Sequence, residues 1–163
     1  MRANIGQSSS LLYLCPHIQI KRARDRDRRA IWRLHLEIKS PHARRINIDE
    51  YFVAIAAGKV VGCAAIRRVR GGGYLYGRAV RGEWRQRGIG TALIVRRLEW
   101  LRARGAKVAV GLVMFWNVSV FRKLGFQTIP RAELPMQYLK LGDFRNERNC
   151  HCATLLKELQ KEG

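Results

Sequence analysis

The sequence has no long apolar run. The longest one near the N-terminus, Leu11–Leu14 followed by Cys15, is far shorter than the roughly 20 residues of a membrane-spanning helix. It is also shorter than the ~7–15 apolar residues of a signal-peptide core. We therefore expect a cytoplasmic protein with no membrane partner. The length of 163 residues, 47% of them hydrophobic, fits one compact domain.

Cysteine is scarce as well. The four cysteines lie at positions 15, 63, 150 and 152, and Cys63 falls in an apolar strand pattern that indicates core. A disulfide framework of the secreted type occurs in shorter, loop-rich chains. The segment Cys150-His151-Cys152 lacks the second ligand pair of a zinc site. We therefore expect free thiols and no metal site.

Acidic residues are few. The chain has 12 of them against 32 lysines and arginines, 24 of which are arginine, and its formal net charge is +20. Such a field attracts polyanions, and nucleic acid or the ribosome is a candidate partner. A basic surface that is merely solvated explains the same composition. Charge bears on partners and solubility, not on fold, so both interpretations stay open.

Hydrophobic periodicity predicts a mixed α/β domain over His17–Gly163, preceded by an N-terminal extension, Met1–Pro16, that shows no clear period. Asp25 or Asp27 is placed to cap the first helix. The expected strands are His17–Lys21, Tyr51–Ala56, Val60–Ile66, Tyr74–Val80, Lys107–Val113, a return at Gly125-Phe126, and Met136–Leu141. The expected helices contain Ile31 to Ile38, Ile94 to Leu101, Asn117–Leu124 and Leu155–Leu159, and the expected turns are Ala57–Lys59 and Gly71–Gly73.

The most informative segment is a glycine-bearing loop, Arg85–Thr91, between a strand and an amphipathic helix. The start of a helix presents unpaired N–H groups and a partial positive charge, which suit a pyrophosphate. Gly88 and Gly90 allow close approach of the backbone, Arg85 and Arg87 add positive charge, and Thr91 offers a hydroxyl. The loop has only two of the three glycines of a Rossmann fingerprint, and no Gly-Lys-Ser/Thr of a P-loop follows. A tight turn with solvated arginines remains the alternative.

Val80–Leu93 resembles motif A of the GNAT acetyltransferases, in which R/Q-x-x-G-x-G/A follows a strand. Arg85, Gly88 and Gly90 fill its three defining places. Asn117 and Phe121–Phe126 resemble the second landmark of the family, an Asn followed by Y/F-x-k-x-G-F. The resemblance extends from about Ile18 to Phe126. It implies a GNAT-like fold, a central mixed β-sheet flanked by helices in a single domain.

The resemblance also implies an activity, N-acetyl transfer from acetyl-CoA to a primary amine by direct attack. The pantetheine arm would lie between the strands Tyr74–Val80 and Lys107–Val113, and the backbone N–H of Val80 would polarise the thioester carbonyl. The implied cofactor-binding residues are Ala79, Val80, Arg85, Gln86, Arg87, Gly88, Ile89, Gly90, Thr91, Asn117 and Phe121. A weaker resemblance to the short N-acetylglutamate synthase-like branch implies an acidic amino acid as acceptor. Other small molecules and protein amines remain open, as does the oligomeric state.

Two positions depart from the family pattern. Tyr74 stands where many members have a glutamate base, and the only carboxylate close in sequence is Glu83. Tyr74, Tyr76, Arg78 and Val80 alternate onto one strand face, so Tyr74 and Tyr76 are expected either to order a water that takes the proton or to fill the sheet surface. Phe121 stands where a tyrosine often protonates the leaving thiolate. These departures keep open a catalytically silent GNAT domain that binds nucleic acid or the ribosome.

Overall fold

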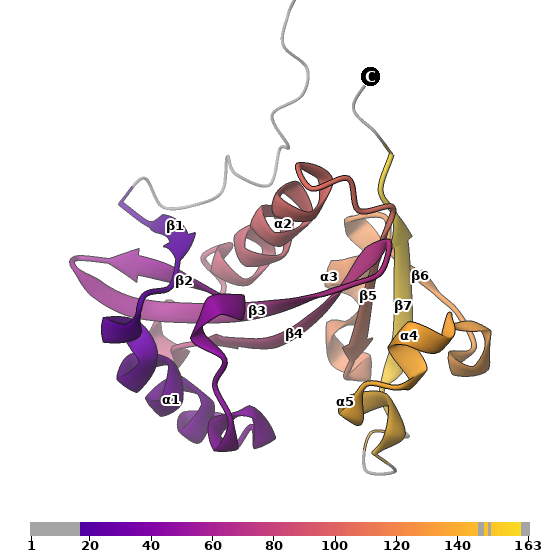
Figure 1. Cartoon of the computed structure of the whole chain (residues 1–163). Helices are drawn as coiled ribbons and strands as arrows, with labels where there is room; N and C mark the ends of the chain where they lie inside the picture. The colour runs from indigo at the N-terminus through magenta and orange to yellow at the C-terminus, as the bar shows by residue number, and fades with distance from the viewer. Residues whose placement is uncertain (1–16, 147–148, 150, 161–163) are drawn as a thin grey trace, which may run out of the picture. The chain divides into compact units, whose positions relative to one another are not determined.

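The computed structural model describes residues 17–146, 149 and 151–160 (Figure 1). The expected extension Met1–Pro16 and the thiol of Cys150 lie outside these residues, so both remain predictions. Within the described ranges, no helix combines the length and the apolar character that crossing a membrane requires.

Seven strands form one mixed sheet in the order β1-β2-β3-β4-β5-β7-β6. The pairs β1–β2, β2–β3, β5–β7 and β6–β7 are antiparallel, and β4–β5 is parallel. The mixed sheet with flanking helices is confirmed. The strands are β1 (Gln19–Arg22), β2 (Tyr51–Ala56), β3 (Lys59–Val69), β4 (Gly72–Val80), β5 (Val108–Val113), β6 (Gln127–Thr128) and β7 (Ala153–Glu158). The helices are α1 (Arg28–Glu37), α2 (Ile89–Arg102), α3 (Val118–Lys123), α4 (Met136–Leu139) and α5 (Gly142–Arg145).

The fold has two compact units. The first comprises the described residues up to Ala65 together with Gly77–Arg96. Here β2 and β3 form a hairpin whose two turn residues, Ala57 and Gly58, both have positive φ, +48° and +73°, as a two-residue type I′ turn requires. Helix α1 buries Ile31 and Leu34 and packs on one face of the sheet, with the first half of α2 on the other (Figure 1). Before α1, the side chain of Asp27 accepts the backbone N–H of Arg24 at 2.8 Å, which closes the 3-10 turn Asp25–Asp27. Asp27 also occupies the N-cap position of α1 but makes no side-chain hydrogen bond there, so the expected cap of this helix by Asp27 was wrong.

The second unit comprises Ile66–Tyr76 and the chain from Arg97 onward. Its core joins Tyr74 and Val110 of the sheet to Leu134, Tyr138 and Phe144, which lie in and around α4 and α5. Strand β7 is inserted between β5 and β6. This unit therefore supplies its own sheet edge and its own hydrophobic core.

Three expectations about this second unit were wrong. Met136–Leu141 is not a strand, because α4 begins directly after Pro135, at its N-cap position. Leu155–Leu159 is not a helix but lies mostly within β7. Neighbouring residues Thr154 and Leu155 are 3% and 0% exposed, so the strand is covered on both faces and shows no alternation. Of the expected turn Gly71–Gly73, only Gly71 turns, with φ +78°.

Gly72 and Gly73 belong to β4 for a steric reason. A Cβ on Gly72 would lie 2.5 Å from the carbonyl oxygen of Val108 on β5. A Cβ on Gly73 would lie 2.5 Å from the side chain of Leu101 on α2. These glycines therefore serve close packing, and the glycine run does not mark flexibility.

Candidate functional site

The loop between β4 and α2 has the backbone of an anion site. Gln86 and Gly88 adopt left-handed conformations, with φ of +60° and +78°. The backbone N–H of Ala92 donates to the carbonyl oxygen of Gly88 at 2.9 Å, so helical bonding begins there. The amides of the preceding first turn, Ile89 to Thr91, have no carbonyl within the helix to bond. Successive amides in such a turn form a concavity that binds anions.

The charges around this loop favour the same ligand. Helix α2 has no acidic residue in its first turn, although the positive end of a helix dipole favours negative charge. Instead, Arg85 Nε donates to the carbonyl oxygen of Val80 at 3.2 Å. The guanidinium of Arg87 lies over the ring of Trp84, 4.7 Å from its centroid. Cations gather at the positive end of a helix, and a bound anion would offset this unfavourable arrangement. The described residues therefore fit a pyrophosphate.

Arg78 adds a half-buried cation beside the helix start. Its Nη1 lies 2.9 Å from the position that a Cβ on Gly90 would take, so a side chain at position 90 would displace the guanidinium. Burial lowers the pKa of Arg78, although an arginine remains charged in proteins. The expected regular alternation along β4 was wrong at this point, because Gly77 has φ +62° and interrupts it. Arg78 consequently lies against α2.

Tyr74 belongs to the second unit and is a packed residue. Its side chain is 3% exposed, meets Phe144 edge-to-face at 5.0 Å and stacks on Tyr76 at 5.5 Å. Its hydroxyl donates to Oδ2 of Asp143 at 2.7 Å. Burial, and then the charge and hydrogen bond of Asp143, raise the pKa of Tyr74 well above its usual value. Tyr74 therefore stays protonated and acts as a donor.

Asp143 is the residue that sequence reasoning missed. It lies 69 residues from Tyr74 in the chain, on α5, in no recognisable motif, and folding alone brings the two together. Its side chain is half-buried, whereas Glu83, the carboxylate close in sequence, is exposed in the turn before the loop. The sequence offered a single signal for Asp143, its acidic side chain, because the late segment around it contains no motif that indicates a function.

Tyr76 is held from two sides within the same unit. The guanidinium of Arg67 lies over its ring, 5.3 Å from the centroid. Its carbonyl oxygen accepts from Nη1 of Arg97 at 3.3 Å, and Arg97 is 1% exposed. A buried arginine therefore fixes the β4 backbone next to Tyr74.

Asn117 and Phe121 lie at and within α3. Asn117 occupies the N-cap position, and its backbone N–H donates to the carbonyl oxygen of Met114 at 2.9 Å. Phe121 is 5% exposed and packs edge-to-face on Phe126 at 5.1 Å. The roles of both toward a cofactor remain predictions. Among the described residues, no group of His, Cys, Asp and Glu is arranged to hold a metal ion.

Comparison with known proteins now identifies the family. The model of the acetyltransferase (GNAT) family matches residues 18–126, a span that contains the anion loop and Asn117. The chain belongs to this family. The resemblance seen in motif A is thereby confirmed.

Solved structures agree with the GNAT assignment. N-acetylglutamate synthase from Neisseria gonorrhoeae, complexed with coenzyme A and N-acetyl-glutamate, matches with a TM-score of 0.76 and 25% identity. The match covers 88% of this chain but only 35% of that enzyme. A Mycobacterium tuberculosis protein in complex with CoA matches over 87% of this chain and 99% of its own (TM-score 0.73, 22% identity). The ribosomal-protein-S18-alanine N-acetyltransferase from Escherichia coli matches over 90% of this chain and 96% of its own (TM-score 0.66, 19% identity). Curated protein sequences give no significant match.

Proposed function

We propose that this GNAT protein is an acetyl-CoA-dependent N-acetyltransferase, which moves an acetyl group from acetyl-CoA to a primary amine by direct attack. The observation that carries the proposal is the loop Arg85–Thr91, where left-handed Gln86 and Gly88 and the free amides of α2 form an anion seat without an acidic residue. Coenzyme A in two of the similar structures supports it. A pyrophosphate is the part of acetyl-CoA that such a seat would hold.

The residues of the chain then have distinct roles. The cofactor-binding residues are Ala79, Val80, Arg85, Gln86, Arg87, Gly88, Ile89, Gly90, Thr91, Asn117 and Phe121. The backbone N–H of Val80 donates to the thioester oxygen as negative charge develops there. The amine nitrogen forms a bond to the carbonyl carbon, the C–S bond breaks, and the sulfur leaves as a thiolate. Solvent protonates this thiolate, because Phe121 has no proton to give.

The proton that the amine loses goes to Asp143. The catalytic set is therefore Tyr74, Tyr76 and Val80, to which we add Asp143. The hydroxyl of Tyr74 donates to Oδ2 of Asp143 at 2.7 Å and orients the carboxyl group. A water ordered by Tyr74 and Tyr76 would pass the proton to Asp143. General base catalysis of this kind contributes typically 10²–10⁴-fold.

A thermal-shift titration with acetyl-CoA tests the proposal. A ligand that binds only the folded state stabilises it by about 2.7 kcal/mol at 100-fold over its dissociation constant. The parent protein should show this rise at low salt and free of nucleic acid, and the variant Gly88→Glu with Arg85→Ala should not. Gly105→Glu is the matched control, because Gly105 also has positive φ, +71°, with nothing within 4 Å of its Cβ position. It carries the same backbone strain and the same added glutamate away from the loop and should keep the shift.

Absence of a shift in the parent would refute the enzyme proposal and favour the silent nucleic-acid-binding alternative. A shift would justify an acceptor screen. The similar structures name an enzyme that makes N-acetylglutamate and one that acts on a ribosomal-protein alanine. Glutamate and N-terminal peptides are therefore the first acceptors to assay.

A further inference from the structure

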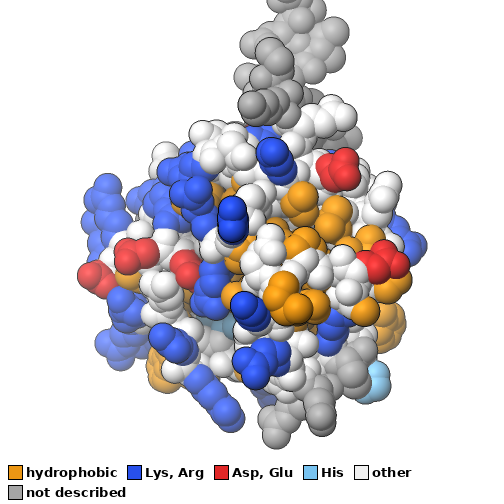
Figure 2. Space-filling model, turned by 45° about the vertical axis from the view of Figure 1, so that its right-hand side comes forward, with side chains coloured by type: hydrophobic (Ala, Val, Ile, Leu, Met, Phe, Trp, Pro, Cys, Tyr) orange, Lys and Arg blue, Asp and Glu red, His pale blue; other side chains and the backbone are white. Residues whose placement is uncertain are grey.

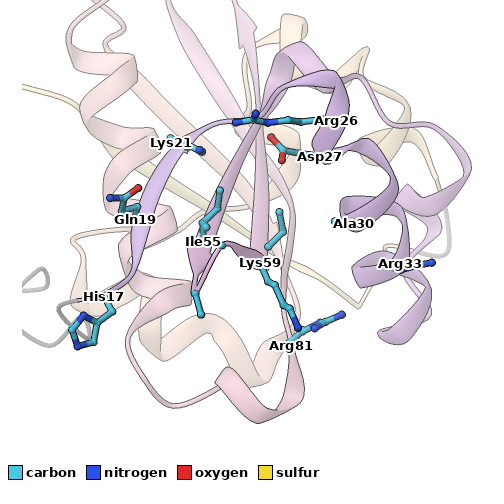
Figure 3. A pocket seen from close by; sticks show the side chains of 13 residues that line it. His17, Gln19, Lys21, Arg26, Asp27, Ala30, Arg33, Ile55, Lys59 and Arg81 are labelled. Atoms are coloured by element: carbon cyan, nitrogen blue, oxygen red, sulfur yellow. The ribbon is translucent and has the colours of Figure 1, made fainter.

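The first unit contains a cavity of about 960 Å³, and none of the residues assigned above to the transfer reaction lines it. It lies between β1, the start of α1 and the β2–β3 hairpin (Figure 3). No residue of the loop Arg85–Thr91 lines it. Its size falls in the range of about 300–1,000 Å³ that small-molecule sites occupy.

Cations from five different segments line this cavity. They are Lys21 on β1, Arg26 before α1, Arg33 on α1, Lys59 on β3 and Arg81 after β4. In Figure 3 the side chain of Lys59 extends toward Arg81. Basic side chains are also numerous on the face in Figure 2, where blue side chains far outnumber red ones. In the cavity, however, five basic residues line one hollow.

Little within the protein neutralises these charges. Arg81 has a carboxylate at 4.0 Å, that of Glu37. For the other four cations, the described part of the chain provides no ion pair and no side-chain hydrogen bond. The one acid in the lining, Asp27, is 7% exposed and accepts the N–H of Arg24. Like charges around a hollow repel one another, and the local potential concentrates anions there.

We propose that this cavity binds a small ligand that carries two or more phosphate groups. Several cations in a hollow match several negative charges better than the single charge of a carboxylate. Arginine and lysine are the side chains that bind phosphate oxygens, arginine through two parallel hydrogen bonds. Other lining residues are small or aliphatic, among them Ala30, Ile55 and Val60, which leaves room for a compact ligand. The concave shape favours a small molecule over an extended nucleic-acid strand.

The phosphates can belong to a separate ligand or to the nucleotide end of acetyl-CoA. The same chemistry recognises both, so the experiment must separate them. The proposal does not depend on the acetyltransferase proposal, because it concerns different residues.

Isothermal titration calorimetry with inorganic tripolyphosphate tests the inference. The protein is titrated alone and saturated with acetyl-CoA. The pocket variant is Lys21→Gln with Lys59→Gln, and the matched control is Lys123→Gln with Lys140→Gln, two exposed lysines outside the cavity. Both variants lose the same net charge. We expect the pocket variant to bind tripolyphosphate at least tenfold more weakly than the parent in the presence of acetyl-CoA or in its absence, and the control to stay within twofold.

Retained binding in the presence of acetyl-CoA identifies a separate ligand. If acetyl-CoA competes with tripolyphosphate in the parent but not in the pocket variant, the cavity binds the nucleotide end of acetyl-CoA. Equal weakening in the pocket variant and its control would overturn the inference, since the binding would then follow net charge alone. Binding of a short single-stranded RNA but not of tripolyphosphate, weakened by the pocket variant, would replace the small ligand by nucleic acid.

Discussion

Two buried tyrosines in the sheet, Tyr51 on β2 and Tyr74 on β4, hydrogen-bond to very different partners. The hydroxyl of Tyr51 lies 3.0 Å from Nε2 of His35, and both residues are 0% exposed. The hydroxyl of Tyr74 donates to Asp143 at 2.7 Å, and Asp143 is only half-buried. Each tyrosine is therefore buried within its own unit, but only Tyr74 hydrogen-bonds to a group that is accessible to solvent.

The difference teaches that the partner of a buried hydroxyl decides what the hydroxyl can do. Burial lowers the pKa of His35 to about 4, helped by nearby His42, so the first cluster stays neutral at physiological pH. The Sγ of Cys63 lies 3.8 Å from Nε2 of His35 and completes this cluster. The second cluster ends in a carboxylate. We therefore expect the cluster around Tyr51 to have a structural role and the cluster around Tyr74 to take part in proton transfer.

Among the variants that test this comparison, Asp143→Asn is expected to have the largest effect, on turnover. The amide oxygen still accepts from Tyr74, so the packing survives, but the proton acceptor is lost. We expect kcat to fall roughly 100-fold or more, while the dissociation constant for acetyl-CoA stays within about twofold. Steady-state kinetics with any acceptor found by the screen measures the first, and a thermal-shift titration measures the second.

Asp49→Asn is the control for this variant, because Asp49 is an exposed aspartate of the first unit and should leave turnover unchanged. If Asp143→Asn keeps turnover within about threefold of the parent, Asp143 is not the base. The two tyrosine clusters would then both be structural.

The two clusters also differ in how far the sequence predicts them. Tyr51–Ala56 is a strand with the bounds that its apolar pattern predicts, and the anion loop follows from local glycine and helix signals. Asp143 has no local signal, because its meaning arises from a contact across 69 residues. The prediction for the segment that forms β7 was wrong for the same reason. Leu155 and Leu159 are spaced as in a helix, and only insertion between β5 and β6 makes the segment a strand.

The histidine of the first cluster gives the next effect, a pH dependence of stability. The pKa of His35 is about 4 in the folded state and 6.5 as a reference for the unfolded state. Above pH 6.5 both states are neutral at this residue, and the full stability is present. As the pH falls from 6.5 to 4, the unfolded state takes up the proton first, so stability declines by about 3 kcal/mol over that window. Urea unfolding at a series of pH values measures this slope.

His35→Gln should remove most of this slope, and the exposed His17→Gln should keep it. Other groups add their own pH dependence, so the comparison concerns the difference between the two variants. Equal slopes would show that His35 is not held neutral. The first cluster would then resemble the second.

Tyr51→Phe sharpens the contrast with a smaller effect. Nδ1 of His35 is buried without a hydrogen-bond partner among the described residues. Removing the tyrosine hydroxyl takes away the 3.0 Å contact at Nε2 as well. We expect a loss of about 1–2 kcal/mol in the free energy of unfolding, with turnover unaffected. Chemical denaturation and steady-state kinetics together check this, and a drop in turnover without a drop in stability would contradict a purely structural role.

Phe121→Tyr introduces a tyrosine on α3 and tests whether its hydroxyl behaves like that of Tyr51 or like that of Tyr74. Phe121 packs on Phe126 at 5.1 Å and lies 3.8 Å from the Cβ position of Gly111. If its ring edge faces the leaving thiolate, the new hydroxyl finds a proton acceptor there, and kcat stays unchanged or rises a few fold. If the edge faces only core, the hydroxyl is left without a partner, which costs about 1–3 kcal/mol of stability. A parallel measurement of kcat and of the unfolding midpoint separates the two cases. A large loss of kcat at unchanged stability would mean that Phe121 packs against the bound ligand, and that the position has no vacant acid role to fill.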